Sequence, residues 1–224
     1  MFTEYEVQLR ERFLAAPVSS APAPWHPVFG PSLPAIPIGG LLGIGFAQAP
    51  DTGHDLVMVV SLDGHGLFDA ATGTLLARDR DPDPDTTDPT GPHLTCPGLG
   101  PLTGTPVHIA GLHGGGLHAT TDDGWTLDVV SPDWPHHRVL LSTDGGLYHG
   151  PAGGDWWHIH HTTHAPLRAV GFSPTGRTLA VATSTDLTLL SRERSGSDDP
   201  PLNGRAGSRP AFLGLPDRTN AQGL

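Results

Sequence analysis

Apolar residues between positions 41 and 194 occur in short runs of roughly five to eight residues, separated about every eight to twelve residues by Gly, Asp or Pro. This rhythm is typical of antiparallel sandwiches, barrels and propellers, in which short strands alternate with tight turns. Two polar segments interrupt it, at residues 79–92 and 192–210. We expect the first to be a long exposed loop and the second to begin a mobile C-terminal tail over residues 196–224.

The first sixteen residues have a different period. Thr3 followed three residues later by Glu6 fits a capping box, which marks the start of a helix. We therefore predict an amphipathic helix over residues 4–15, within an N-terminal segment 1–16. A helix this short is marginal alone and must dock on something. Its apolar stripe, at three- and four-residue spacing, consists of Phe2, Tyr5, Leu9 and Phe13.

Residues 17–40 are rich in proline and include the run APAPWHPVFGPSLPAIP. Proline fixes φ and lacks an N–H group, so this stretch is predicted to form neither a helix nor a central strand. Its PxxP spacing matches an SH3-type ligand, although no Arg flanks it. We favour an extended strap or linker that wraps over the core.

Similarity between two segments of the chain favours a propeller among the possible β folds. Residues 61–76 (SLDGHGLFDAATGTLL) align with residues 142–157 (STDGGLYHGPAGGDWW) after a one-residue gap. Both indicate a strand, an Asp-Gly turn, a second strand, a Gly turn and a third strand, which is typical of repeated propeller blades.

Two segments resemble blades of the WD-repeat family. Residues 167–190, LRAVGFSPTGRTLAVATSTDLTLL, resemble the first three strands of such a blade. Residues 66–77, GLFDAATGTLLA, resemble the last two strands of another, with Phe68 and Asp69 where the family usually has Trp-Asp. The resemblance implies an all-β fold, a small or incomplete β-propeller of about four blades over residues 41–195, with a short N-terminal helix and a Pro-rich strap.

Four blades barely close a ring. We therefore expect either that the strap or the C-terminal end supplies missing strands, or that a second chain completes an open arc, because unpaired blade edges invite association. The predicted blades lie near residues 41–80, 105–131, 132–164 and 165–195.

Charge excludes some partners. The formal net charge is −11, and all 12 basic residues are scattered Arg, so binding to nucleic acid or to an anionic membrane is not expected. The first six residues are acidic where a secretory signal would be basic, and no apolar run approaches the ~20 residues of a membrane helix. These features favour a cytoplasmic location.

The most distinctive chemical feature is the segment WWHIHHTTH, residues 156–164. On a regular strand, a two-residue period would place His158 and His160 on one face and Trp157 and Ile159 on the other. We expect that His-bearing face to point to solvent or a groove.

Two interpretations of this segment stay open. Neighbouring imidazoles on one strand face can converge on Zn²⁺, and the third ligand beside His158 and His160 could be His164, His149 or His118. The favoured alternative is a polar, aromatic-lined surface that binds no metal. Zinc is the only cofactor that the sequence suggests, and no residue is predicted to be catalytic or to bind another cofactor.

Tryptophan is the remaining signal. Large amphipathic rings near propeller loop tips commonly line binding faces. We assign partner binding to Trp134 and Trp156, together with the helix residues Phe2, Tyr5, Leu9 and Phe13. We also expect the helix to dock on a partner or a second copy rather than on its own core, because the core leaves edges exposed.

Three functions follow from these features. The favoured one is a non-catalytic intracellular protein-interaction module, or an accessory subunit of a larger bacterial assembly such as a conflict or defence system, by analogy with small propellers from GC-rich genomes. Its partner would be a protein or a second copy of the chain. The alternatives are a metal-dependent enzyme that uses the His cluster and a propeller that binds a small ligand or a glycan through its Trp residues.

Overall fold

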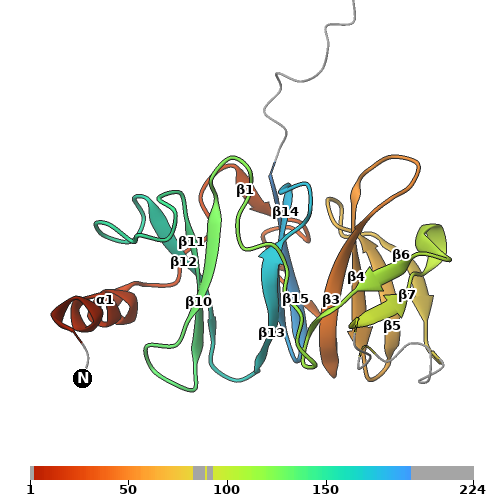
Figure 1. Ribbon diagram of the computed structural model, residues 1–224, viewed down its shortest axis with the longest axis horizontal. Coiled ribbons are helices and arrows are strands. Elements are labelled where there is room, and N and C mark those ends of the chain that lie inside the picture. The colour runs from red at the N-terminus through yellow and green to blue at the C-terminus, as the bar shows by residue number, and fades with distance from the viewer. Residues whose placement is uncertain (1–2, 83–88, 90–92, 193–224) are drawn as a thin grey trace, which may run out of the picture. The chain divides into compact units, whose positions relative to one another are not determined.

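The computed structural model describes residues 3–82, 89 and 93–192, all within one compact unit (Figure 1). Phe2, most of the expected loop at 79–92 and the expected mobile tail at 196–224 lie outside the described residues. The described residues are mostly antiparallel β-structure with one short α-helix, which confirms the all-β class. None of the sheets in this part of the chain is closed.

The helix is the element that the sequence predicts most closely. It is α1, Glu4–Ala15, and it begins with the expected capping box. The Thr3 hydroxyl accepts a hydrogen bond from the Glu6 N–H at 3.2 Å, and the Thr3 N–H donates to the Glu6 carboxylate at 2.7 Å. These two bonds satisfy backbone groups that have no partner within the helix.

The strands of the described residues form four antiparallel sheets. The β4 sheet has the order β6-β5-β4-β3-β9, with β3 Leu41–Gln48, β4 Asp55–Ser61, β5 Gly64–Asp69, β6 Leu75–Asp79 and β9 Ala110–Gly111. The β7–β8 ladder joins β7 Thr95–Pro97 to β8 Pro106–His108, with a short 3₁₀-helix, η1 Gly100–Leu102, between them. The β11 sheet contains β10 Thr126–Val130, β11 His137–Ser142 and β12 Trp156–Thr162. The β14 sheet contains β13 Leu167–Phe172, β14 Thr178–Thr183 and β15 Asp186–Arg192.

The Pro-rich strap adds strands to the β14 sheet. Both β1, Trp25–Pro27, and β2, Ile36–Pro37, pair with β15. Pro27 and Pro37 are tolerated because they lie on the edge of the sheet, where a missing N–H group leaves no ladder bond broken. The indole of Trp25 is buried and lies 5.6 Å from the ring of Phe172.

The sheets pack face to face in layers, as the ribbon in Figure 1 shows. The β14 sheet packs on the β4 sheet through one face and on the β11 sheet through the other. The far face of the β4 sheet packs against the β7–β8 ladder, and the far face of the β11 sheet packs against α1. Strands β4, β11 and β14 are therefore apolar on both faces, which explains their continuous hydrophobic runs.

Two of the four predicted repeats need correction. Residues 41–80 and 165–195 coincide with β3–β6 and β13–β15, but β8, β9 and β10 within 105–131 belong to three different sheets. Strand β10 pairs with β11, so it belongs with residues 132–164. The middle strand expected within 142–157 is also missing, since residues 143–155 form a loop.

A connecting segment, residues 108–120, runs along one edge of each of three sheets. It pairs with β3 at Gly43 and Gly111, forms a bridge between His118 and Phe172 on β13, and then reaches β10. This close approach requires glycine on the sheet side: a Cβ atom on Gly45 would lie 2.1 Å from the carbonyl oxygen of His108. No helix among the described residues is long and apolar enough to cross a membrane.

Candidate functional site

A groove of about 710 Å³ lies between α1 and the residues that follow β10. Its polar lining comes from Glu6, Arg10, Ser131 and Asp133. The apolar lining is larger and comes from both sides: Val7, Leu9, Phe13, Val130, Pro132 and Trp134. We call this feature the α1 groove.

Helix α1 is fixed on its own chain by packing and by hydrogen bonds. The ring of Phe13 makes edge-to-face contacts with Tyr148 at 5.0 Å and with Trp156 at 5.7 Å. Arg10 donates to the Pro132 carbonyl at 2.8 Å, and Arg138 donates to the Phe13 carbonyl at 3.1 Å. Aromatic packing of Phe13 and the hydrogen bonds of Arg10 and Arg138 therefore fix the position of α1, which forms one side of the groove.

These contacts correct the expectation that α1 docks on a partner rather than on its own core. The outer face of the β11 sheet carries buried apolar side chains, including Leu140 and Trp156, and α1 is the element that covers them. Phe13 is buried in this interface. The physical reason is that a sheet with two apolar faces needs a cover on each face.

The predicted partner-binding residues separate into four groups. Leu9, Phe13 and Trp134 line the α1 groove, and the Trp134 side chain is 78% exposed. Trp156 is 0% exposed and belongs to the core, so its assignment to a partner surface is wrong. Tyr5 is 61% exposed but does not line the groove, and Phe2 lies outside the described residues.

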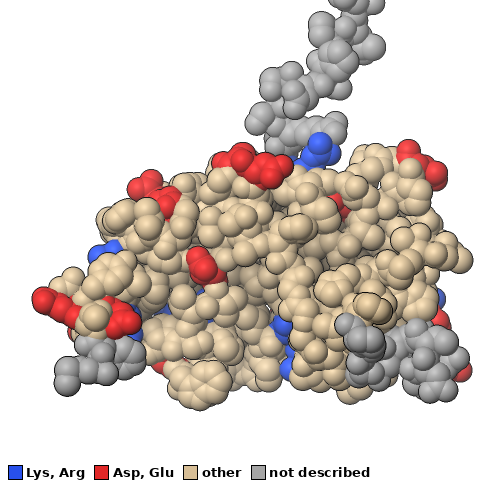
Figure 2. All heavy atoms as spheres, viewed as in Figure 1, with Lys and Arg blue, Asp and Glu red and all other residues tan. Residues whose placement is uncertain are grey.

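Acidic side chains outnumber basic ones on α1. Figure 2 shows acidic side chains gathered over this helix, which carries Glu4, Glu6 and Glu11. Hydrogen bonds from the backbone and side chain of Thr3 hold the pKa of Glu6 below its usual value. The two basic groups keep their positive charge while Arg12 donates to the Tyr148 carbonyl and Arg10 to the carbonyl of Pro132. The groove therefore presents apolar surface whose charged lining is two carboxylates, Glu6 and Asp133, and one guanidinium, Arg10.

Asp133 links the α1 groove to a polar cluster. Its carboxylate accepts long hydrogen bonds from Arg138, at 3.3 and 3.4 Å, and these hold the pKa of Asp133 below its usual value. The Nδ1 atom of His136 and the Nε2 atom of His161 lie 3.9 and 3.8 Å from the same carboxylate oxygen, Oδ2. One carboxylate and two imidazoles thus share a small space beside the groove.

The expected His158, His160 and His164 cluster does not form. Strand β12 has a β-bulge at Ile159, because His158 pairs with Leu140 whereas His160 pairs with the adjacent Val139. A bulge inserts one residue and so reverses the alternation of side chains after it. His158 and His160 therefore face opposite sides of the sheet, and His164 lies beyond the end of β12.

The imidazoles of His158 and His160 both lie in environments that disfavour their charged forms. His158 is 1% exposed under α1, and its Nδ1 atom lies 3.0 Å from the carbonyl oxygen of Ala16. Burial lowers the pKa of His158 and also that of His160. The expectation that these two rings point together to solvent or a groove is wrong, and a shared zinc site on them is not supported.

The sequence interpretation missed the cluster of Asp133, His136 and His161. An available signal was the Asp-x-x-His spacing at 133–136, in the turn between β10 and β11. A regular two-residue period could not predict that His161 belongs to this cluster, because only the bulge turns its side chain toward the α1 side of the sheet. On that side its ring lies 5.7 Å from the ring of His158.

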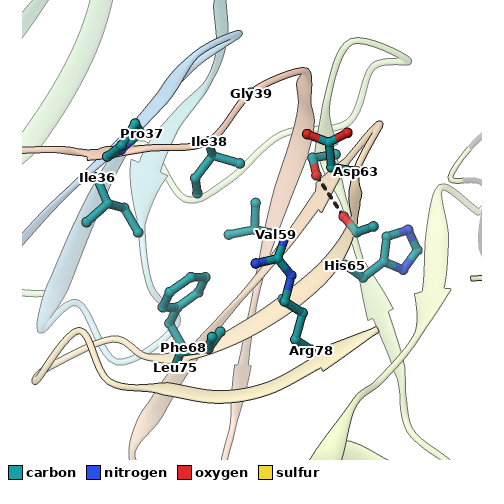
Figure 3. A pocket seen from close by; sticks show the side chains of 13 residues that line it. Ile36, Pro37, Ile38, Gly39, Val59, Asp63, His65, Phe68, Leu75 and Arg78 are labelled. Atoms are coloured by element: carbon teal, nitrogen blue, oxygen red, sulfur yellow. Dashed lines mark hydrogen bonds between the residues drawn. The ribbon is translucent and has the colours of Figure 1, made fainter. Parts of the chain in front are cut away.

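A second cavity, of about 310 Å³, lies between the end of the strap and strands β4 to β6 (Figure 3). Asp63, His65, Phe68 and Arg78 line it, and the Arg78 side chain extends toward Val59. No tryptophan lines this cavity. It therefore does not match the Trp-lined site expected for a small ligand or a glycan.

His65 makes protein stability sensitive to pH. Burial lowers its pKa, and the charge of Asp79 only partly opposes this shift. Below about pH 6.5 the unfolded chain binds a proton that folded His65 rejects. The contribution of neutral, buried His65 to the free energy of unfolding is therefore fully present above about pH 6.5. It is lost as pH falls toward the lowered pKa of His65 in the folded state. We expect the melting temperature to fall less between pH 7.5 and pH 5 in His65→Gln than in the wild type.

The matched control is His54→Gln, because His54 is exposed. Melting followed by circular dichroism across this pH range should give wild-type behaviour for the control variant. Equal pH dependence in His65→Gln and the wild type would contradict a role for His65.

Comparisons with protein-family models, with curated proteins and with solved structures found no match to this chain. The resemblance of residues 66–77 and 167–190 to WD-repeat blades therefore stays a prediction. Function is inferred from the geometry of the α1 groove and of the neighbouring polar cluster.

Proposed function

We propose that this chain is a non-catalytic protein-interaction module, acting as an accessory subunit that binds an apolar, basic segment of a partner protein in the α1 groove. The observation that carries this proposal is Trp134, which is 78% exposed at the side of an apolar groove of about 710 Å³. The other two functions have less support, because the predicted zinc ligands diverge and the second cavity has no tryptophan.

The distribution of apolar surface supports a docking role. Single exposed apolar residues are normal, but here an exposed Trp134 and a partly exposed Val7 flank the more deeply placed Leu9 and Phe13. Trp is enriched among the residues that dominate binding energy at protein interfaces, since one rigid ring supplies a large contact area. The rigid attachment of α1 lets the groove bind a partner without first ordering itself.

Charge identifies the chemistry of the partner. On α1 the exposed carboxylates of Glu4, Glu6 and Glu11 outnumber the two guanidinium groups, Arg10 and Arg12, so the helix side chains carry a net negative charge. Complementary charge favours a segment that carries Lys or Arg between its apolar anchors. An amphipathic helix of a partner protein meets both requirements, because it presents apolar residues on one face.

We also propose that the four sheets are the blades of an open β-propeller. The β4 sheet and the β14 sheet each contain consecutive antiparallel strands, and the β11 and β4 sheets pack on either side of the β14 sheet. Among the described residues, none of the four hydrophobic clusters joins the β7–β8 ladder to the β11 sheet. In this proposal α1 covers the blade face that a closed ring would cover with the next blade.

Selection from a display library of random 16-residue peptides tests the interaction proposal. We expect the enriched peptides to combine apolar residues at three- and four-residue spacing with Lys or Arg. Trp134→Ala should weaken their binding, measured by fluorescence anisotropy, by roughly tenfold or more, because it removes the main anchor.

The matched control is Leu62→Ala. Leu62 is 77% exposed, like Trp134, but it lies in the β4–β5 turn. This variant should bind the selected peptides with wild-type affinity. Peptides that bind Trp134→Ala as tightly as the wild type, or a selection that enriches acidic rather than basic peptides, would contradict the proposal.

A further inference from the structure

We propose that Asp133, His136 and His161 form a binding site for a divalent transition-metal ion, with Zn²⁺ as the expected occupant. These residues differ from the His residues of the predicted cluster, and the inference does not rest on peptide binding in the α1 groove. Two elements supply them: Asp133 and His136 lie between β10 and β11, and His161 lies on β12.

The donor atoms are close enough to share one ion. One ligand atom from each residue lies within 4.8 Å of the other two. The distances from Asp133 Oδ2 are 3.9 Å to His136 Nδ1 and 3.8 Å to His161 Nε2. Two ligands of one tetrahedral Zn²⁺, bound at about 2.0–2.2 Å, lie roughly 3.3–3.6 Å apart. The two distances from Asp133 Oδ2 therefore need a contraction of a few tenths of an ångström, and His136 is on a connection rather than in a strand, so its imidazole can move toward that of His161.

The hydrogen bonding of the His161 side chain provides a second observation. Its Nε2 atom is buried and has no hydrogen-bond partner. A neutral imidazole nitrogen with a free lone pair is the form that ligates metal, and coordination would satisfy a polar atom that is otherwise unpaired.

Arg138 opposes the metal through its charge but does not block the site. Its Nη2 atom lies 3.3 Å from Asp133 Oδ2, while its Nε atom lies 3.4 Å from the other oxygen, Oδ1. Both distances are long for charge-assisted bonds. Oδ1 can keep its contact with the guanidinium while Oδ2 binds the ion. We therefore expect lower affinity than at a closed structural zinc site.

The donor set identifies the class of ion. Two imidazole nitrogens and one carboxylate oxygen suit Zn²⁺ and its neighbours in the transition series, whereas Mg²⁺ prefers oxygen ligands alone. Three protein ligands leave a fourth position for water, and the partial exposure of Asp133 and His136 gives the ion access from solvent. Asp133 also lines the α1 groove, so the site lies at the edge of that groove.

Isothermal titration of the full-length, chelator-treated protein with ZnCl₂ tests the proposal. We expect binding of about one ion per chain at this site, with MgCl₂ giving no comparable heat. His136→Ala and His161→Ala should each weaken the binding of Zn²⁺ at least tenfold and abolish the rise in melting temperature that Zn²⁺ gives the wild type. His136→Ala is the decisive variant if His161→Ala fails to fold, because His136 is more exposed.

The matched control is His149→Ala. His149 lies 4.0 Å from Asp144, in a similar His–carboxylate pair, but no third ligand joins this pair among the described residues. This variant should bind Zn²⁺ like the wild type. Absence of Zn²⁺ binding in the wild type, wild-type affinity in His136→Ala, or an equal loss in His149→Ala would overturn the proposal.

Discussion

Replacing Trp156 with alanine is expected to lower the free energy of unfolding by about 3–5 kcal/mol. The indole is 0% exposed and makes edge-to-face contacts with Phe13 and with Tyr148, whose ring centroid lies 5.7 Å away. Its removal leaves a cavity between α1 and the β11 sheet and frees the Gly150 carbonyl, which accepts a hydrogen bond from the indole N–H at 3.3 Å. Urea denaturation followed by circular dichroism measures the change.

Trp134→Ala is the control for the loss of an indole ring. Trp134 is mostly exposed, so this variant should change the free energy of unfolding by no more than about 0.5 kcal/mol. The pair of variants separates a core role from a surface role for two residues of the same type. Equal stability of the two variants would show that α1 and Trp156 do not form the interface described above.

The second large effect is expected at Gly45 on β3. A Cβ atom there would lie 2.1 Å from the His108 carbonyl oxygen and 2.9 Å from Cγ1 of Val107. The oxygen belongs to backbone that is held in the β7–β8 ladder, so it cannot move away as a flexible side chain could. We expect Gly45→Ala to lower the free energy of unfolding by about 1–3 kcal/mol, measured in urea.

Gly116 provides the matched comparison. It lies in the connecting segment that follows β9, a Cβ atom there would have open space within 4 Å, and its backbone is not left-handed. Gly116→Ala should therefore leave stability unchanged or raise it slightly, because alanine restricts the unfolded chain. Destabilisation of the same size in both variants would point to backbone flexibility rather than close packing.

Local patterns predicted the elements of this fold that local interactions determine. The capping box of Thr3 and Glu6 fixes the start of α1, and it can be identified because its two partners are three residues apart. The strands of residues 41–80 could be predicted for a similar reason, since tight turns such as 62–63 join consecutive strands of one sheet. The prediction of one blade at 105–131 was wrong because the strands there pair within three different sheets.

The candidate site depends on features that no local pattern reports. The bulge at Ile159 separates His158 from His160 and turns His161 toward the α1 side of the sheet. The bulge lies opposite Val139 and Leu140, which are about twenty residues earlier in the chain. Trp134 and Trp156 also could not be distinguished by sequence alone, because only the position of α1 decides which indole is covered.

The pairing of the strap with β15 has a consequence for synthesis of the chain. Trp25 lies opposite Arg192 in this ladder, so the two partners are made at nearly opposite ends of the described sequence. At about 5–20 residues per second, the ribosome needs roughly 10–30 s to reach β15 after it has made β1. During that time Trp25 has no completed sheet in which to bury its ring. Completion of the β14 sheet is therefore a late, long-range step, and this topology favours slow assembly with an apolar N-terminal segment exposed while translation continues.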